Sequence, residues 1–88
     1  MLFLVAFKSS SEAAKADAKA YLDSIAETCW HEFDGIWFIK TDKTAIEIRD
    51  RLKCLSGPDD GVAVALLAGF AAWHGFDEKA QKWLLKHL

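Results

Sequence analysis

The stretch that decides the fold is WHEFDGIWFIK, which covers residues 30–40. Asp34-Gly35 at its centre is the dipeptide most typical of a two-residue hairpin turn, because glycine tolerates the positive φ that such a turn needs. The Trp, Phe and Ile residues on either side suit the pleated surface of a sheet. The stretch therefore predicts two antiparallel strands, over residues 30–33 and 36–40.

An amphipathic segment lies on each side of this hairpin. Before it, Ser9 to Glu12 offers a capping box, and the alanine-rich stretch that follows predicts a helix. The apolar face of this first helix comprises Ala14, Ala18, Tyr21, Leu22, Ile25 and Cys29. After the hairpin, Thr41-Asp42 supplies an N-cap for a second helix, with Thr44 and Glu47 as a second possible box. Its buried stripe comprises Ala45, Ile48, Leu52 and Leu55, and Gly57-Pro58 ends it.

The outer segments complete the pattern. Residues 2–7 and 62–67 are short apolar runs that predict strands buried on both faces, the second of them central in the sheet. Residues 69–76 are ambiguous between a turn and a fifth strand, and Asp77 can cap a last helix. The order strand, helix, strand, strand, helix, strand, helix indicates one α+β domain over residues 1–88. This is a split βαβ (βαββαβ) arrangement with an antiparallel four-stranded sheet and an extra C-terminal helix.

Charge is low overall and uneven along the chain. The net charge is −2, from 11 Lys and Arg against 13 Asp and Glu, which excludes a strongly basic nucleic-acid binder. Residues 36–58 form the only segment in which basic residues outnumber acidic ones. We therefore expect any contact with an anion or an acidic partner on the second helix, at Arg49, Arg51 and Lys53. Nucleic-acid binding is expected to be weak or absent.

Residues that could carry catalysis or hold a cofactor do not converge in the sequence. No serine lies in a glycine-flanked elbow, and the five glycines form no phosphate-binding pattern. Alternation along a strand puts His31 on the face opposite Glu32 and Asp34, so the three cannot share a metal ion. His87 falls in the last turn of the final helix, where the helix dipole favours a positive imidazole. We expect no catalytic residue, metal, cofactor or small-molecule substrate.

Cysteine usage and hydropathy bear on the compartment. Cys29 and Cys54 stand 25 positions apart without a secretory leader, which predicts free, buried thiols. No apolar run approaches the roughly 20 residues of a membrane helix. The expectation is a cytoplasmic protein with no membrane partner.

Some apolar side chains fall outside the predicted core. Ile46 points away from the stripe of the second helix, and Leu85 points away from the apolar face of the last helix, which comprises Ala80, Trp83, Leu84 and Leu88. Together with four tryptophans in a small domain, they favour a self-association surface. The expected interface residues are Ile46, Trp73, Phe76 and Leu85.

Four short motifs occur in order along the chain: Trp37-x-Ile39-x-Thr41, Ala45-x-x-Ile48-Arg49-Asp50-x-Leu52, Asp60-x-Val62 and Ala72-Trp73-x-Gly75-Phe76. This series resembles a group of small bacterial and phage proteins described as SinR-like. That group is similar to the smaller, ferredoxin-like subunit of the CRISPR spacer-acquisition complex. The resemblance implies a ferredoxin-like fold and a homodimer. In the CRISPR-associated relatives an aspartate linked to metal-dependent nuclease activity follows the first strand, and here Lys8 occupies its position. A protonated lysine cannot ligate a divalent cation, so the nuclease role does not carry over.

The first hypothesis for function is therefore a non-enzymatic, homodimeric interaction module. The alternatives are a metal-dependent nuclease that uses other carboxylates such as Asp59 or Asp60, and a phage-encoded inhibitor that binds a host protein. A ligand-sensing domain with a small molecule at its dimer interface ranks last.

Overall fold

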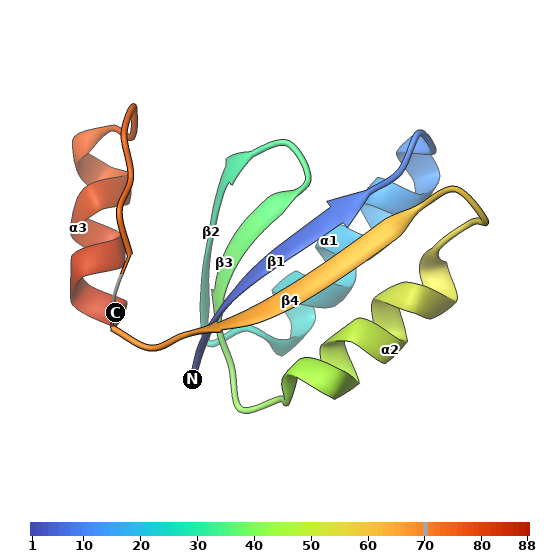
Figure 1. Cartoon of the computed structure of the whole chain (residues 1–88), viewed down its shortest axis with the longest axis horizontal. Helices are drawn as coiled ribbons and strands as arrows, with labels where there is room; N and C mark the ends of the chain where they lie inside the picture. The colour runs from blue at the N-terminus through green and yellow to red at the C-terminus, as the bar shows by residue number, and fades with distance from the viewer. Residues whose placement is uncertain (70) are drawn as a thin grey trace.

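Four strands form one antiparallel sheet in the order β2-β3-β1-β4 (Figure 1). The computed structural model describes residues 1–69 and 71–88. The elements in chain order are β1 (Leu2–Lys8), α1 (Glu12–Ile25), β2 (Thr28–Phe33), β3 (Ile36–Lys40), α2 (Ala45–Leu55), β4 (Gly61–Leu67) and α3 (Glu78–His87). This α+β architecture of four strands and three helices is compatible with a ferredoxin-like arrangement. None of these helices is long and apolar enough to cross a membrane.

The β2–β3 hairpin turns where the sequence predicts. Gly35 has a φ of +77°, and its carbonyl oxygen accepts a hydrogen bond of 2.7 Å from the Phe7 amide of β1. A Cβ atom at position 35 would lie 2.6 Å from the Phe7 carbonyl oxygen, closer than any real Cβ contact. Glycine is thus needed here both for the positive φ and for the close approach of β1.

Helices α1 and α2 cover one face of the sheet and enclose the core. Alternate residues of the central strands point into it, and these are Phe3, Val5, Phe7, Trp37 and Ile39. They meet the apolar stripes of the helices, whose buried members are Ala18, Leu22, Ile48 and Leu52. The second of the two caps predicted for α2 is the one that forms: the Thr44 Oγ1 accepts from the Glu47 amide at 3.1 Å. The Thr41-Asp42 cap is wrong, because α2 begins only at Ala45 and the Thr41 hydroxyl donates to the Ile25 carbonyl oxygen instead. The α1 prediction needs correction: Ser11 is the N-cap, because its Oγ accepts from the Ala14 amide, whereas Ser9 bonds only the Ser11 amide.

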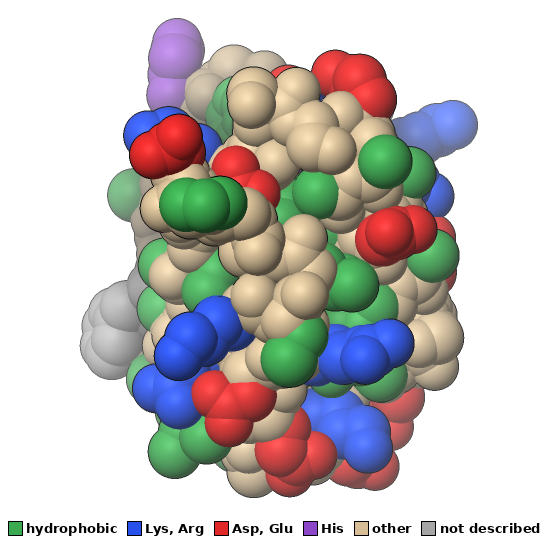
Figure 2. Space-filling model, turned by 90° about the vertical axis from the view of Figure 1, so that its right-hand side faces the viewer, with side chains coloured by type: hydrophobic (Ala, Val, Ile, Leu, Met, Phe, Trp, Pro, Cys, Tyr) green, Lys and Arg blue, Asp and Glu red, His purple; other side chains and the backbone are tan. Residues whose placement is uncertain are grey.

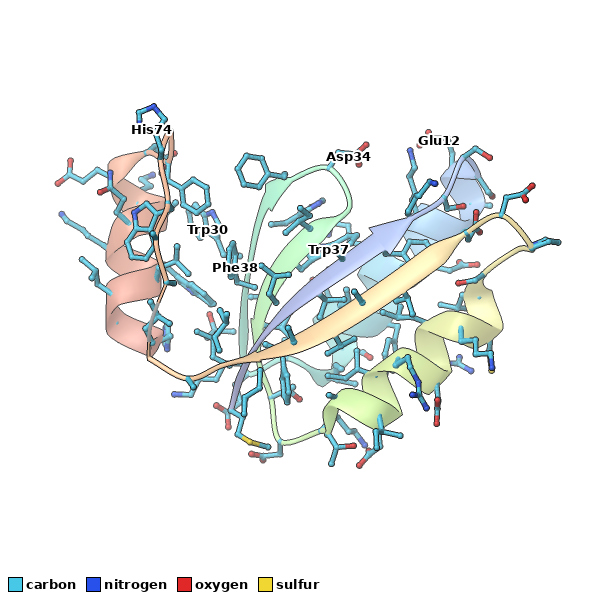
Figure 3. The ribbon with its side chains drawn as sticks, in the orientation of Figure 1. Glu12, Trp30, Asp34, Trp37, Phe38 and His74 are labelled. Carbon is cyan, nitrogen blue, oxygen red and sulfur yellow. The ribbon has the colours of Figure 1, made fainter. Side chains whose placement is uncertain are left out.

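The C-terminal segment covers the β2–β3 part of the opposite face. The Trp83 Nε1 of α3 donates a hydrogen bond of 2.9 Å to the Thr28 Oγ1 of β2, and the Trp83 ring lies 6.5 Å from that of Trp30. In Figure 3, Trp30 and Phe38 point from the sheet towards this segment, whereas Trp37 lies on the other side. Ala63 and Ala65, on the part of this face that belongs to β4, are exposed.

Three further expectations change. Residues 62–67 form not a central strand but β4 at the edge of the sheet, because β1 pairs with both β3 and β4 and so takes the central position. Cys29 lies in β2 and not on α1, because α1 ends at Ile25 and the chain has turned into the hairpin. No fifth strand forms among residues 68, 69 and 71–77, and Phe70 lies outside the described residues.

Candidate interaction surface

The outer edge of β4 carries backbone groups that the sheet does not pair. The backbone groups of Met1 and Phe7 form hydrogen bonds with residues at the two ends of β3. Because backbone groups alternate in direction along a strand, the odd-numbered residues of β1 direct their amides and carbonyls towards β3. The even-numbered ones must then bond β4 at Ala63 and Ala65, given the register Leu4↔Ala65 and Ala6↔Ala63. The amides and carbonyls of the intervening β4 residues therefore point outwards. These residues are Val62, Val64 and Leu66.

Apolar side chains border this edge. Leu66 is 53% exposed, and Ile46 of α2 is 62% exposed. A groove of about 340 Å³ runs between α2 and β4, lined by Ala45, Ile46, Arg49 and residues 62–64. We call this area, made of Ile46, Arg49 and residues 62–66, the β4–α2 surface. It contains the predicted interface residue Ile46 but none of the other three.

Trp73 and Phe76 belong to a second apolar area, on the far side of the sheet. Phe76 packs against Phe33 and Phe38, with ring centroids 5.3 and 6.2 Å away, and Trp73 stacks on Phe76 at 6.3 Å. Both side chains are half-buried by these contacts within the chain. They line a groove of about 380 Å³ together with Leu4 and other apolar residues of the sheet. His74 also lines this groove, at the top of the C-terminal segment in Figure 3.

Leu85 is 69% exposed on α3, which lies beyond β2 at the opposite side of the sheet from β4. The four predicted interface residues therefore occupy three separate places: the β4–α2 surface, the aromatic groove and the outer side of α3.

The three basic residues of α2 are all exposed but do not face the same way. The Arg49 guanidinium donates two hydrogen bonds of 3.0 and 2.7 Å to the neighbouring Asp50 carboxylate. Arg51 lies over the ring of Tyr21, 5.9 Å from its centroid, and thus points towards α1. Lys53 follows Arg49 by one helical turn. On the face shown in Figure 2, basic and acidic side chains lie next to each other, and no wide area carries a single sign.

Lys8 and the two aspartates of the proposed nuclease come together at one end of the sheet. Lys8 ends β1 opposite Gly61, and it lines a cavity of about 330 Å³ with Ser9, Ser10, Asp59 and Asp60. The Asp60 carboxylate accepts a hydrogen bond of 2.7 Å from the Gly57 amide and so stabilises the turn before β4. Among the residues that the structure describes, no three His, Cys, Asp or Glu side chains come close enough to hold a metal ion.

The cysteines and His87 complete the reactive groups. Both cysteines are free, Cys29 half-buried in β2 and Cys54 exposed on α2. The predicted burial of Cys54 is wrong, because its position lies off the Ile48–Leu52 stripe that faces the core. Burial raises the pKa of the Cys29 thiol, with Asp23 adding to this and Lys19 opposing it. His87 packs on Trp83, with ring centroids 4.7 Å apart. Burial, followed by Lys40 and Lys86, lowers the pKa of His87, so the expectation of a favoured positive imidazole is wrong.

The sequence-based reasoning missed Val62, Val64 and Leu66 as surface candidates. A run with apolar residues at every position is typical of a strand buried on both faces, and nothing in the run itself marks it as an edge. The usable signal lay in the order of elements. In a split βαβ unit the second crossover brings the last strand beside the first, with no later strand to cover it.

Comparison with protein-family models gives no match, and neither the curated proteins nor the solved structures give a significant match.

Proposed function

We propose that this protein is a non-enzymatic, homodimeric interaction module of the cytoplasm, built on a ferredoxin-like split βαβ domain with an added C-terminal helix. The observation that carries the proposal is the β4–α2 surface, where an outermost strand, a groove and the exposed side chains of Ile46 and Leu66 lie together. Contiguous exposed apolar areas on small domains mark sites of association.

The proposed fold has support in the strand order. An antiparallel sheet in the order β2-β3-β1-β4, with the helices after β1 and β3 on one face, is what two interleaved βαβ units produce. The proposed compartment has support in the two free thiols, since reducing compartments keep cysteines unpaired.

Sedimentation velocity over a range of protein concentrations tests the proposal. We expect a species of twice the monomer mass. A chain that stays monomeric at all concentrations would refute the homodimer. Addition of a short DNA duplex is expected to leave the sedimentation profile unchanged, because the chain has a net charge of −2 and mixed charges on the face shown in Figure 2.

Two lysine substitutions locate the contact. Ile46→Lys places a charge on the β4–α2 surface and should weaken the dimer, because an unpaired charge in an apolar contact is costly. Leu85→Lys places the same charge on a leucine of similar exposure on α3, and we expect it to leave the dimer unchanged. The opposite pattern would assign dimerisation to α3.

A nuclease assay with Mg²⁺ and with Mn²⁺ addresses the enzymatic alternative. We expect no cleavage of single- or double-stranded DNA or RNA above that of a mock purification. Cleavage that disappears in Asp60→Ala, while circular dichroism shows a folded chain, would overturn the non-enzymatic proposal.

A further inference from the structure

The two edges of the sheet differ in how they are protected. Edge strands usually avoid pairing with other chains through bulges, charged side chains, prolines or a covering element. β2 shows two of these features: its register with β3 shifts between Trp30 and Phe33, and α3 packs against it through Trp83. β4 has no bulge, charged side chain or proline, and although α2 packs beside it, the sheet leaves the outward backbone groups of its edge unpaired. All seven of its residues, Gly61–Leu67, are uncharged, none is proline, and they pair with β1 in unbroken register.

The residues of β4 are complementary to a second copy of the same strand. In an antiparallel pair with a two-fold axis at Val64, each Val64 faces its symmetry mate, Val62 faces Leu66, and Ala63 faces Ala65. All three contacts join apolar side chains of compatible size. The same register directs the outward amides and carbonyls of Val62, Val64 and Leu66 at those of the other copy, so every outward group of these residues gains a partner.

We propose that two copies of this chain associate by antiparallel pairing of their β4 strands about a two-fold axis at Val64, which joins both sheets into one continuous sheet. This inference rests on the proposed function, because it specifies the interface of the proposed homodimer. An isologous contact of this kind buries the same edge in both copies and closes the assembly at two.

Charge and shape at the β4–α2 surface favour a second copy as the occupant. Among the described residues that line the groove, the charged one is Arg49, and its guanidinium donates two hydrogen bonds to the Asp50 carboxylate. Two copies can therefore approach without like-charge repulsion, whereas a strongly acidic or basic partner would find no counter-charge. The groove runs beside the edge, so a strand added there also covers the exposed side chain of Ile46.

Disulfide trapping tests the register directly. In the pair we propose, the two Val64 Cα atoms lie about 5.5 Å apart, within the range that a disulfide spans. The two Val62 residues of such a dimer are offset by roughly four residues along the paired strands. Their Cα atoms therefore lie about 13 Å apart, which is too far for a disulfide. In a Cys29→Ala, Cys54→Ala background, we expect Val64→Cys to form a covalent dimer on mild oxidation. Val62→Cys, the matched control, should stay monomeric on a non-reducing gel.

A proline substitution tests the backbone hydrogen bonds. The Leu66 amide points away from β1, so Leu66→Pro removes an outward donor from each copy while the β1–β4 ladder stays intact. We expect the dimer Kd to rise about tenfold or more. Leu66→Ala shortens the same exposed side chain but keeps the amide, and it should raise the Kd less. Circular dichroism spectra that match those of the original chain establish that each variant is folded.

The outcomes separate this inference from the proposed function. A dimer that is trapped through position 64, not through position 62, and weakened by Leu66→Pro supports both. A wild-type dimer that Leu66→Pro leaves intact, or that cross-links through position 62, overturns the β4 pairing and leaves the homodimer standing on another surface. A wild-type chain that is monomeric, with no cross-link at position 64, overturns both.

Discussion

Replacement of Gly35 by alanine tests the junction between the hairpin and the central strand. Gly35 has a φ of +77°, and a Cβ atom there would approach the Phe7 carbonyl oxygen to 2.6 Å. The obstructing atom belongs to the backbone of β1 and cannot rotate away as a side chain could. The turn must therefore move, and the hydrogen bond of 2.7 Å from the Phe7 amide to the Gly35 carbonyl oxygen must lengthen or break.

Gly75 supplies a matched control for the size of the effect. Its φ is +82°, but a Cβ atom there would meet no atom of residues 1–69 or 71–88 within 4 Å. Both alanine variants bear the cost of a left-handed conformation, about 1–2 kcal/mol. Gly35→Ala additionally loses a hydrogen bond at a buried strand and leaves its groups unpaired, which costs about 1–3 kcal/mol. We expect Gly35→Ala to lower the free energy of unfolding by about 2–5 kcal/mol and Gly75→Ala by about 1–2 kcal/mol.

Urea denaturation followed by far-ultraviolet circular dichroism measures both losses on the same scale. A chain of 88 residues has a total stability of about 4–13 kcal/mol, so the expected loss for Gly35→Ala is a large share of it. Equal losses in the two variants would refute the reasoning, because they would mean that the close approach of Phe7 to position 35 adds nothing to the conformational cost.

Three further predictions concern the core, the α3 contact and pH. Leu52 is fully buried, so Leu52→Ala should lower the free energy of unfolding by about 2–5 kcal/mol. Leu85→Ala, at an exposed site, should change it by less than about 0.5 kcal/mol, and similar losses in urea denaturation would contradict the core assignment. The Trp83–Thr28 hydrogen bond should appear as a coupling of about 0.5–1.5 kcal/mol in a double-mutant cycle of Trp83→Phe and Thr28→Val, and additive losses would exclude it. Because the pKa of His87 is lower in the folded chain than in the unfolded chain, the unfolded chain binds the proton at a higher pH. Protonation of His87 therefore favours unfolding, so its contribution to stability is present above about pH 6.5 and is lost as the pH falls below that value. The melting temperature of His87→Gln should therefore fall less than that of the wild type between pH 7.5 and 5.5, and parallel curves would contradict this sign.

Local signals in the sequence predicted most of the elements. Asp34-Gly35 located the hairpin, and the periodicity of residues such as Ile48 and Leu52 identified the helix faces that the structure buries. These predictions succeeded because a turn with positive φ and an amphipathic stripe are each determined within a few residues. Asp77 was likewise identified as a cap, and its carboxylate accepts from the Ala80 amide at 2.8 Å.

The candidate surface could be predicted only in part. Ile46 stood out because it departs from the helical stripe, which is again a local signal. The position of β4 at the sheet edge depends on which strands pair with β1, a contact between distant parts of the chain that no local pattern encodes. The aromatic residues of the C-terminal segment present the same difficulty. The sequence predicts Phe76 at an interface with another chain, whereas its packing against Phe33 and Phe38 depends on where this segment folds back.

The central place of β1 in the sheet has a consequence for how the protein folds. β1 precedes the other three strands of the sheet along the chain, yet one of its two neighbours is β4, the last of them. Leu2 therefore pairs with Leu67 only after the whole segment between them has been made. Pairing between such distant segments slows folding, because loop-closure entropy is lost before the contacts form. During synthesis the apolar edge of β1 that β4 later occupies stays open until residues 61–67 have left the ribosome. A chain that stops before residue 61 should therefore aggregate, whereas one that stops after residue 67 still holds every strand of the sheet.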